Sequence, residues 1–211
     1  FKRPLVPILT IAWIEIQDGS AEAELKQRIL AADVCISDLD GTDADPARIV
    51  ASNAWKPSLT FSPRYWSWLA SVTNGIAREG EAAHSRLWLD YCGRFLSSPE
   101  EQAEVSRYFD EWAVRDSLFP GVEDFYGSLN GTSKIYVTRN ILPIAKAYMD
   151  TLEFSGIFAQ TFDKEHFMSN FIEDFSCRRV LVKGDSVEDE AMLAPLEYHK
   201  QKGRIDDYVF I

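Results

Sequence analysis

Residues 34–42 read VCISDLDGT, in which the apolar run 34–37 leads directly into Asp38, Asp40 and Gly41. A short continuous apolar run that ends at Asp and Gly is typical of a buried strand that meets a loop. A glycine in that loop allows the backbone to approach a ligand closely. We therefore predict a buried strand whose carboxyl end carries two carboxylates.

Strand-like and helix-like patterns alternate along the chain on both sides of this stretch. Such alternation predicts an α/β fold with a parallel sheet and right-handed crossovers, a Rossmann-like core. The helices of this alternating pattern are predicted at 21–32, 122–129, 141–152, 164–175 and 187–193. Besides 34–37, the predicted strands are 134–138, 160–162, 180–182 and 208–211.

Residues 43–118 differ from the rest, because they hold five of the six tryptophans and show helical periodicity without a strand-like run. Helices are predicted there at 65–76, 82–95 and 99–112, so we interpret this part as an all-helical insertion over the loop edge of the sheet. The predicted domains are an N-terminal extension of unclear placement at 1–32, a core of 33–44 with 117–211, and a helical cap at 45–116.

Composition and charge limit the partners of the protein. The 211 residues carry 33 Asp and Glu against 22 Lys and Arg, a formal net charge of −11. That charge repels a polyanion, so we expect no nucleic-acid partner. The most apolar stretch, 5–16, is shorter than the roughly 20 residues of a membrane span. Three separated cysteines, Cys35, Cys92 and Cys177, favour reduced thiols in a cytoplasmic protein.

Polar residues follow the predicted strands at points that share one edge of the sheet. They are Asp38 and Asp40, then Thr138 and Arg139, then Lys164, and finally Asp185 and Asp189. In an open parallel sheet the ligand site lies beyond the carboxyl ends of the strands. Several carboxylates in a small volume repel one another unless a cation is bound, and Mg²⁺ is the hard cation that oxygen ligands suit best. A lysine and a threonine hydroxyl beside them suit a phosphate group.

The order and spacing of these residues resemble the haloacid dehalogenase-like (HAD-like) superfamily. The family has Asp-x-Asp-Gly-Thr after an apolar run, a strand that ends in Ser or Thr, a later Lys, and Gly-Asp-x-x-x-Asp. The matching residues are Asp38-Leu39-Asp40-Gly41-Thr42, Ile135-Tyr136-Val137-Thr138, Lys164 at 21 residues before Asp185, and Gly184-Asp185 with Asp189. The resemblance covers about residues 33–211, and its first and last motifs are the specific ones.

The resemblance implies a magnesium-dependent phosphatase that hydrolyses a small phosphate monoester, with a helical cap that closes over the site. It implies that Asp38 attacks phosphorus to form a phospho-aspartate and that Asp40 acts first as an acid and then as a base. The implied metal set is Asp38, Asp40 through its backbone carbonyl, Asp185 and Asp189. We expect the substrate phosphate to be bound by Thr138, Arg139, Lys164 and Gly41.

Three residues depart from the family pattern. Asp43 stands where the family usually has an apolar residue, so it either perturbs the packing of the loop or adds a carboxylate near the metal. Arg139 and Asn140 replace the small residues of phosphoserine phosphatase-like members, so a phosphoserine substrate is not supported. Lys183 is a weaker candidate than Lys164 for the lysine of the site, because a residue within a strand is more suited to packing in the fold.

Two other functions stay open at this point. A phosphotransferase or mutase would use the same residues and pass the phosphoryl group to a sugar. A non-catalytic HAD-like binding domain of a larger protein would keep the fold alone. The sequence leaves the oligomeric state and the identity of the phosphorylated substrate open.

Overall fold

Five parallel strands form one sheet in the order β3-β2-β1-β4-β5, with β1 at its centre. The strands are β1 (Val34–Ser37), β2 (Ser133–Val137), β3 (Gly156–Phe158), β4 (Arg179–Lys183) and β5 (Asp207–Phe210). All four residues of β1 are buried, as a central strand covered on both faces requires. This sheet confirms the predicted α/β class and its Rossmann-like parallel core.

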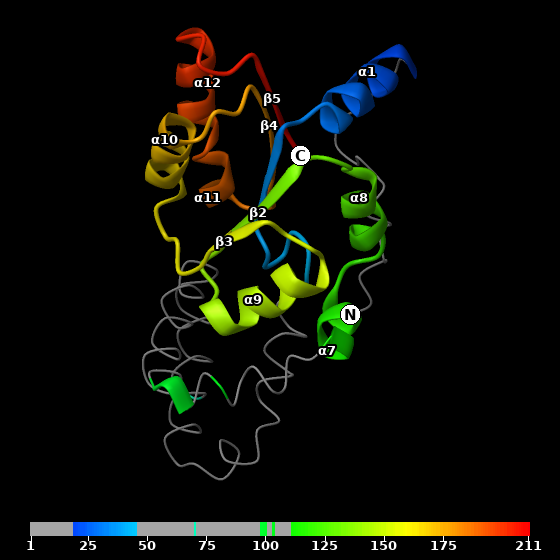
Figure 1. The fold of residues 1–211 in the computed structure, drawn as a ribbon, viewed down its shortest axis with the longest axis vertical. Helices are drawn as coiled ribbons and strands as arrows, with labels where there is room; N and C mark the ends of the chain where they lie inside the picture. The colour runs from blue at the N-terminus through cyan, green and yellow to red at the C-terminus, as the bar shows by residue number, and fades with distance from the viewer. Residues whose placement is uncertain (1–18, 46–69, 71–97, 101–102, 104–110) are drawn as a thin grey trace.

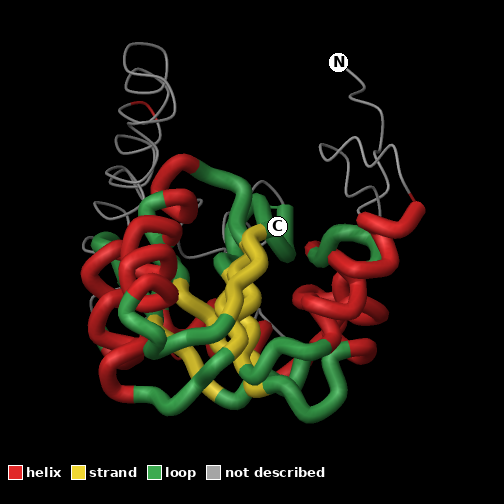
Figure 2. Tube along the Cα trace, turned by 90° about the horizontal axis from the view of Figure 1, so that it is seen from above, coloured by secondary structure: helices red, strands yellow, loops and turns green. Residues whose placement is uncertain are grey.

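The structure is a computed structural model that describes residues 19–45, 70, 98–100, 103 and 111–211. Helices lie on both sides of the sheet in the described part of the chain (Figures 1 and 2). They are α1 (Gly19–Leu30), α7 (Glu111–Ser117), α8 (Val122–Ser128), α9 (Leu142–Thr151), α10 (Lys164–Asp174), α11 (Val187–Glu190) and α12 (Leu193–Gln201). Of the described helices, none is long and apolar enough to cross a membrane.

Two hydrophobic clusters, one on each face of the sheet, make up the core. Successive side chains of a strand point to opposite faces. Tyr136 therefore packs in the cluster that contains Tyr126 of α8 and Tyr148 of α9. Its neighbours Ile135 and Val137 pack in the other cluster, which contains residues of α10 and α12. The helices on both faces explain why the strand sequences are nearly continuous apolar runs rather than alternating ones.

The structure differs from two of the sequence-based predictions. The strand predicted at 160–162 is wrong, because the third strand is Gly156–Phe158, which pairs with Ile135 to Val137 of β2. Gln160 has a φ of 56°, which an extended strand does not allow. The helix predicted at 187–193 divides into α11 and α12, and α12 continues to Gln201.

The predicted cap at 45–116, with helices 65–76, 82–95 and 99–112, lies mostly outside the described residues. The two ends of this segment are described, and they lie together. Ala44 and Leu118 form an antiparallel bridge, and the amide of Asp45 donates to the carbonyl oxygen of Ser117 at 3.0 Å. The described residues that flank the segment are therefore neighbours. Val114 of α7 is fully buried in the core, so this last helix before the return packs with the sheet domain.

Part of the predicted N-terminal extension packs on the core. Ile29 of α1 is buried in the same cluster as Tyr126. Arg28 donates to both carboxylate oxygens of Asp207 on β5, at 2.6 and 2.9 Å. Helix α1 is thus anchored to the core by the apolar side chains of Leu25 and Ile29 and by the bidentate ion pair of Arg28.

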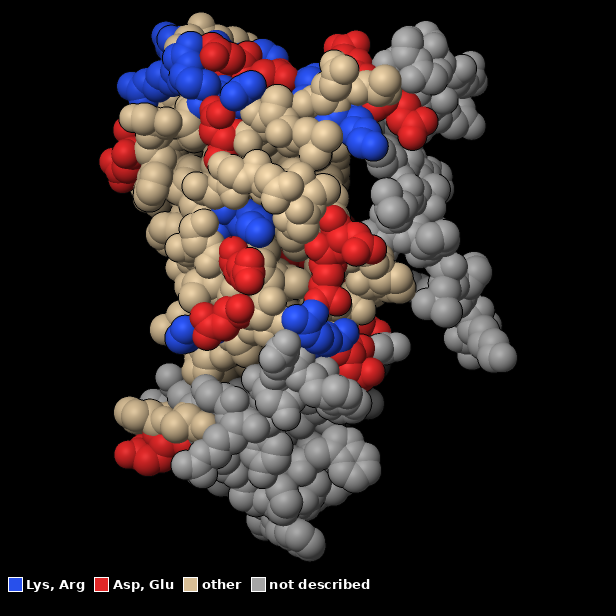
Figure 3. All heavy atoms as spheres, turned by 45° about the vertical axis from the view of Figure 1, so that its right-hand side comes forward, with Lys and Arg blue, Asp and Glu red and all other residues tan. Residues whose placement is uncertain are grey.

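Charged side chains of both signs intermingle at the end of the molecule that carries α12 (Figure 3). Three ion pairs contribute there: Arg178 with Asp206, Arg204 with Glu173 at 2.8 Å, and Lys200 with Asp207 at 3.0 Å. Because these pairs are exposed, each adds little to stability. The local charges on this part of the surface compensate one another.

Candidate active site

The strand order reverses at the carboxyl ends of β1 and β4. The chain runs from β1 to β2 and β3 on one side of the sheet, and then to β4 and β5 on the other side. Ligands of open α/β sheets bind where the strand order reverses in this way. Ser37, the last residue of β1, is in register with Lys183, the last residue of β4. Asp38 therefore emerges beside Gly184 and Asp185.

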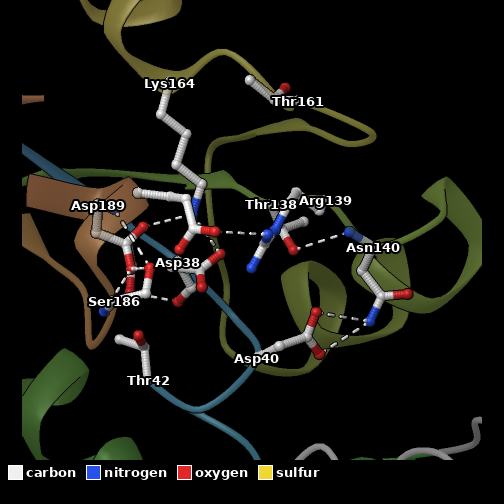
Figure 4. A network of polar contacts seen from close by, with 12 residues as sticks. Asp38, Asp40, Thr42, Thr138, Arg139, Asn140, Thr161, Lys164, Ser186 and Asp189 are labelled. Atoms are coloured by element: carbon white, nitrogen blue, oxygen red, sulfur yellow. Dashed lines mark hydrogen bonds and ion pairs between the residues drawn. The ribbon is translucent and has the colours of Figure 1, made fainter. Parts of the chain in front are cut away.

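Lys164 lies between two carboxylates at this edge of the sheet (Figure 4). It is the first residue of α10, whose N-cap Asp163 accepts a hydrogen bond from the amide of His166 at 2.9 Å. Its Nζ lies 2.9 Å from Oδ1 of Asp38 and also donates to Oδ1 of Asp189. All three side chains of this ion-paired group are buried.

Burial makes the ionised carboxylates of the site costly. It raises the pKa of Asp38 to about 7, although the charge of Lys164 opposes the rise. It also raises the pKa of Asp185. Burial alone would lower the pKa of Lys164, but the charges of Asp38 and Asp189 outweigh that effect and raise it. One lysine therefore only partly compensates the carboxylates, and a bound cation would relieve the rest.

Three carboxylates are close enough together to hold such a cation. Among the described residues, one oxygen each of Asp38, Asp185 and Asp189 lies within 4.8 Å of the others. Oxygen ligands of this kind suit a hard divalent cation such as Mg²⁺. The donor set present therefore fits the ion that the sequence predicted.

Asp189 also stabilises the loop that carries Asp185. Its Oδ2 accepts hydrogen bonds from the amides of Asp185 and Ser186, both at 3.1 Å, and from Oγ of Ser186 at 2.6 Å. Its Oδ1 is bonded to Lys164. Four donors on one carboxylate leave little coordination capacity for a metal. Asp189 is therefore better placed to orient the neighbouring carboxylates than to bind a cation directly.

Gly41 and Thr42 fix the side chain of Asp185 from the opposite loop. Oγ1 of Thr42 donates to Oδ1 of Asp185 at 2.9 Å. A Cβ at Gly41 would lie 2.2 Å from Oδ2 of Asp185, and the φ of Gly41 is +84°. The amide of Gly41 donates to the carbonyl oxygen of Ala44 at 2.9 Å. This turn uses the N–H that we expected to bind phosphate, so here Gly41 contributes space rather than a hydrogen bond.

Asp40 leaves the loop away from the three-carboxylate group and meets Asn140. Nδ2 of Asn140 donates to both oxygens of Asp40, at 3.0 and 3.3 Å. The amide of Ile141 donates to Oδ1 of Asn140 at 2.8 Å, which fixes the orientation of the side chain. Burial raises the pKa of Asp40 to about 6, against the lowering effect of Asn140. A carboxyl group with that pKa can both give and take a proton near neutral pH.

Thr138 and Arg139 line the same edge at the end of β2. The buried Oγ1 of Thr138 accepts a hydrogen bond from the amide of Asn140 at 3.1 Å. Its own hydroxyl proton is suited to donation to a phosphate oxygen. Nη1 of Arg139 lies 3.2 Å from Oε1 of Glu188, which places a guanidinium between the β2 and β4 loops. The structure thus brings all eight predicted site residues to one edge of the sheet.

Sequence reasoning missed three contacts that shape the site. Asn140 was noted only as a departure from the family pattern, whereas its amide holds Asp40. Thr42 and Ser186 lie inside the recognised motifs. Ser186 and Asp189 have the spacing of a capping box, which could have indicated their contact, whereas nothing in the spacing of Thr42 shows that it holds Asp185. A polar residue two positions after a predicted strand end was the one available signal for Asn140.

Comparison with known proteins gives limited information. No family model matches the sequence, and no curated protein matches it. Among solved structures, the chain is similar to the magnesium-bound crystal form of YfnB from Bacillus subtilis, which is assigned to the HAD hydrolases. The TM-score is 0.41 at 13% sequence identity, and the match covers 83% of this chain and 87% of that chain. At this level the similarity is weak, so the interpretation of the site rests on its own geometry.

Proposed function

We propose that this protein is a magnesium-dependent phosphatase of the HAD-like type, which hydrolyses a small phosphate monoester through a phospho-aspartate on Asp38. The observation that carries the proposal is the buried carboxylate of Asp38 at the carboxyl end of β1, 2.9 Å from Nζ of Lys164 and close to Asp185. A nucleophilic carboxylate, a fixed cationic side chain and a metal-binding carboxylate meet there at one point.

In the first step, an oxygen of Asp38 attacks phosphorus and the bond from phosphorus to the alcohol oxygen breaks. Asp40 gives its proton to that leaving oxygen. In the second step, Asp40 takes a proton from water, the water oxygen attacks phosphorus, and the bond to Asp38 breaks. The pKa of about 6 for Asp40 suits a group that must be protonated in one step and ionised in the next.

Other residues hold the phosphoryl group while charge spreads over its oxygens. We assign this role to Lys164, to the hydroxyl of Thr138 and to Arg139. Asp38 and Asp185, with the backbone carbonyl of Asp40, would hold Mg²⁺, and Asp189 would orient them. The ion, when bound, offsets the carboxylate charge and polarises the phosphoryl oxygens.

The segment between Asp45 and α7 is proposed to be a cap over this site. The bridge between Ala44 and Leu118 supports this, because it brings both ends of the segment next to the loop of Asp38. A segment joined at one place can close as a unit and exclude water while the acyl phosphate exists.

The test is a screen of phosphate monoesters with the purified protein, with Mg²⁺ and after chelation with EDTA. We expect hydrolysis that needs Mg²⁺ and that Asp38→Asn abolishes, whereas Asp150→Asn on the exposed surface of α9 keeps it. Trapping of a phosphorylated protein with one labelled substrate would locate the intermediate.

Repeating the screen with added sugars and alcohols separates hydrolysis from transfer. Release of inorganic phosphate at a rate independent of the acceptor supports the phosphatase, and a phosphorylated acceptor as the main product supports the transferase. Full activity of Asp38→Asn would contradict the mechanism. Absence of both activity and Mg²⁺ binding in the wild-type protein would favour a non-catalytic domain.

A further inference from the structure

A second polar network lies on the core side of the active-site loop. Asp43 is fully buried and forms an ion pair with Nζ of Lys183. Two buried tyrosines donate to its Oδ2, Tyr126 at 2.6 Å and Tyr136 at 2.8 Å. Oγ of Ser37 lies 3.3 Å from the same oxygen. These five residues come from four elements and the loop, and they are called the Asp43 network below.

The network shares a loop with the proposed active site but faces the opposite way. The amides of Asp43 and Ala44 donate to the carbonyl oxygen of Leu39 at 2.9 and 3.0 Å. This tight turn directs Asp38 to Lys164 on one side and Asp43 to Lys183 on the other. Asp43 therefore lies apart from the candidate metal ligands, and Lys183 does not replace Lys164. The sequence left two interpretations of Asp43, and the structure does not support an added carboxylate near the metal.

Two hydrogen bonds connect the network directly to the catalytic loop. Nζ of Lys183 donates to the carbonyl oxygen of Thr42 at 3.1 Å, and Oγ1 of Thr42 donates to Asp185. Oγ of Ser37 donates to the carbonyl oxygen of Asp38 at 2.9 Å. These bonds thus fix the backbone carbonyl groups of Asp38 and Thr42, on either side of Gly41, from the core side of the loop.

The tyrosines remain proton donors in this environment. Burial, with the charge of Asp43, raises the pKa of Tyr126 and that of Tyr136 well above the usual range. Their rings also pack on Phe154, with a centroid distance of 4.8 Å for Tyr126 and 3.9 Å for Tyr136. Rigid rings therefore fix the directions from which Asp43 receives its hydrogen bonds.

A buried ion pair is a weak source of stability, because the loss of hydration offsets most of the attraction. Apolar side chains of similar volume often serve a core equally well. A fully hydrogen-bonded network instead restricts the groups that it joins to a single arrangement. Here those groups are the loop of Asp38 and, through Thr42, the side chain of Asp185.

We propose that Asp43 and Lys183 are positioning residues, which hold the Asp38 loop in the geometry that binds Mg²⁺. The inference rests on the proposed function, because the site that they position is the candidate magnesium site. Supporting groups around metal ligands typically change metal affinity by about 10–100-fold when removed. The effect on turnover follows from the same displacement of Asp38 and Asp40.

The test uses the double variant Asp43→Leu with Lys183→Met, because either single change would leave a buried charge unpaired. Mg²⁺ alone is titrated by calorimetry, and thermal unfolding is followed in EDTA. We expect a somewhat lower melting temperature, because the buried hydroxyl of Tyr136 loses its acceptor, but a folded protein whose affinity for Mg²⁺ is about 10–100-fold lower and whose fall in kcat exceeds any change in KM. The matched control is Lys146→Met with Asp150→Leu, an exposed pair on α9, which should change none of these.

A second variant covers the case in which the double variant does not fold. Tyr126→Phe with Tyr136→Phe removes two donors to Asp43 and keeps the rings packed, and we expect a several-fold loss of Mg²⁺ affinity. Wild-type affinity for Mg²⁺ in the folded variants would overturn the positioning role and leave the phosphatase proposal untouched. A wild-type protein that binds Mg²⁺ but hydrolyses no phosphate ester would instead overturn the proposed function, while the change in affinity still tests the network.

Discussion

The side-chain amide of Asn140 donates to both carboxylate oxygens of Asp40. Asn140 follows β2, whereas Asp40 follows β1, so the contact joins two neighbouring loops at the carboxyl edge of the sheet. Because Ile141 fixes the amide in turn, Asp40 is held in one orientation. Asp40, the proposed general acid and base of the reaction, is therefore oriented by a residue outside its own motif.

Replacing Asn140 with leucine should lower turnover by about 10–100-fold, because Asp40 loses its orientation. The amide donors favour the ionised form of Asp40, so their loss raises the pKa of Asp40 further. The step before the phospho-aspartate needs Asp40 protonated, and the alkaline limb of kcat/KM should therefore move to higher pH. The measurement is a pH profile at saturating Mg²⁺, with Asn170→Leu on the exposed face of α10 as the control. An unmoved limb in Asn140→Leu would show that Asp40 is not the titrating group.

The metal-free protein should lose stability as pH rises from about 4 to about 7. The pKa of Asp38 is about 7 in the folded protein, against 3.8 for the unperturbed group. A raised pKa means that the folded state holds the proton more tightly, so the contribution is fully present below pH 4 and is lost as pH rises through 7. Asp40, with a pKa of about 6, acts in the same direction.

Asp38→Asn removes the largest part of that dependence, since the amide needs no proton. In EDTA at pH 7.5 we expect this variant to be more stable than the wild type, by on the order of 4 kcal/mol as an upper bound. The difference should vanish near pH 4, and Mg²⁺ should stabilise the wild type more at pH 7.5 than at pH 5. Thermal unfolding of both proteins across this range is the measurement. Parallel curves for the two proteins would contradict the raised pKa.

Lys164→Met should separate the binding of phosphate from the binding of metal. Methionine keeps most of the volume but leaves Asp38 and Asp189 buried without their cation, which should destabilise the metal-free protein by about 3–5 kcal/mol. Turnover should fall by at least about 100-fold, whereas Mg²⁺ affinity should be kept or increased because the site is more negative. Lys146→Met, from an exposed pair, should cost less than about 1 kcal/mol. A loss of Mg²⁺ affinity in Lys164→Met would mean that the lysine supports the metal site rather than the phosphate.

Gly41→Ala should disturb the metal site through one methyl group. Gly41 and Gly131 have similar φ values, +84° and +80°, but only the Cβ at Gly41 meets Asp185. Both alanine variants should lose about 1–2 kcal/mol of stability from backbone strain. Only Gly41→Ala should also lose Mg²⁺ affinity and activity, because Asp185 must move. Equal behaviour of the two variants in a Mg²⁺ titration would refute a close approach at Gly41.

Much of this architecture follows from local pattern. The strands β1, β2 and β4 can be recognised in the sequence as nearly continuous apolar runs, because central parallel strands are buried on both faces. β3 was predicted four residues too late. It is a three-residue edge strand that is only partly buried, so its composition gives a weak signal. Its pairing with β2 defines it instead. The helix predicted at 187–193 begins where expected, at the capping box between Ser186 and Asp189, but it ends at Glu190 and a second helix begins at Leu193.

The sequence by itself determined that Asp38, Asp40, Thr138, Lys164, Asp185 and Asp189 share one edge, because parallel strands all end on the same side of a sheet. Only the tertiary structure decided what each side chain contacts. The direction of a loop side chain depends on the register of strands that are far apart in sequence, such as Ser37 beside Lys183. That register turns the side chain of Asp43 into the core and places Asn140 within hydrogen-bond distance of Asp40, and no local pattern encodes either contact.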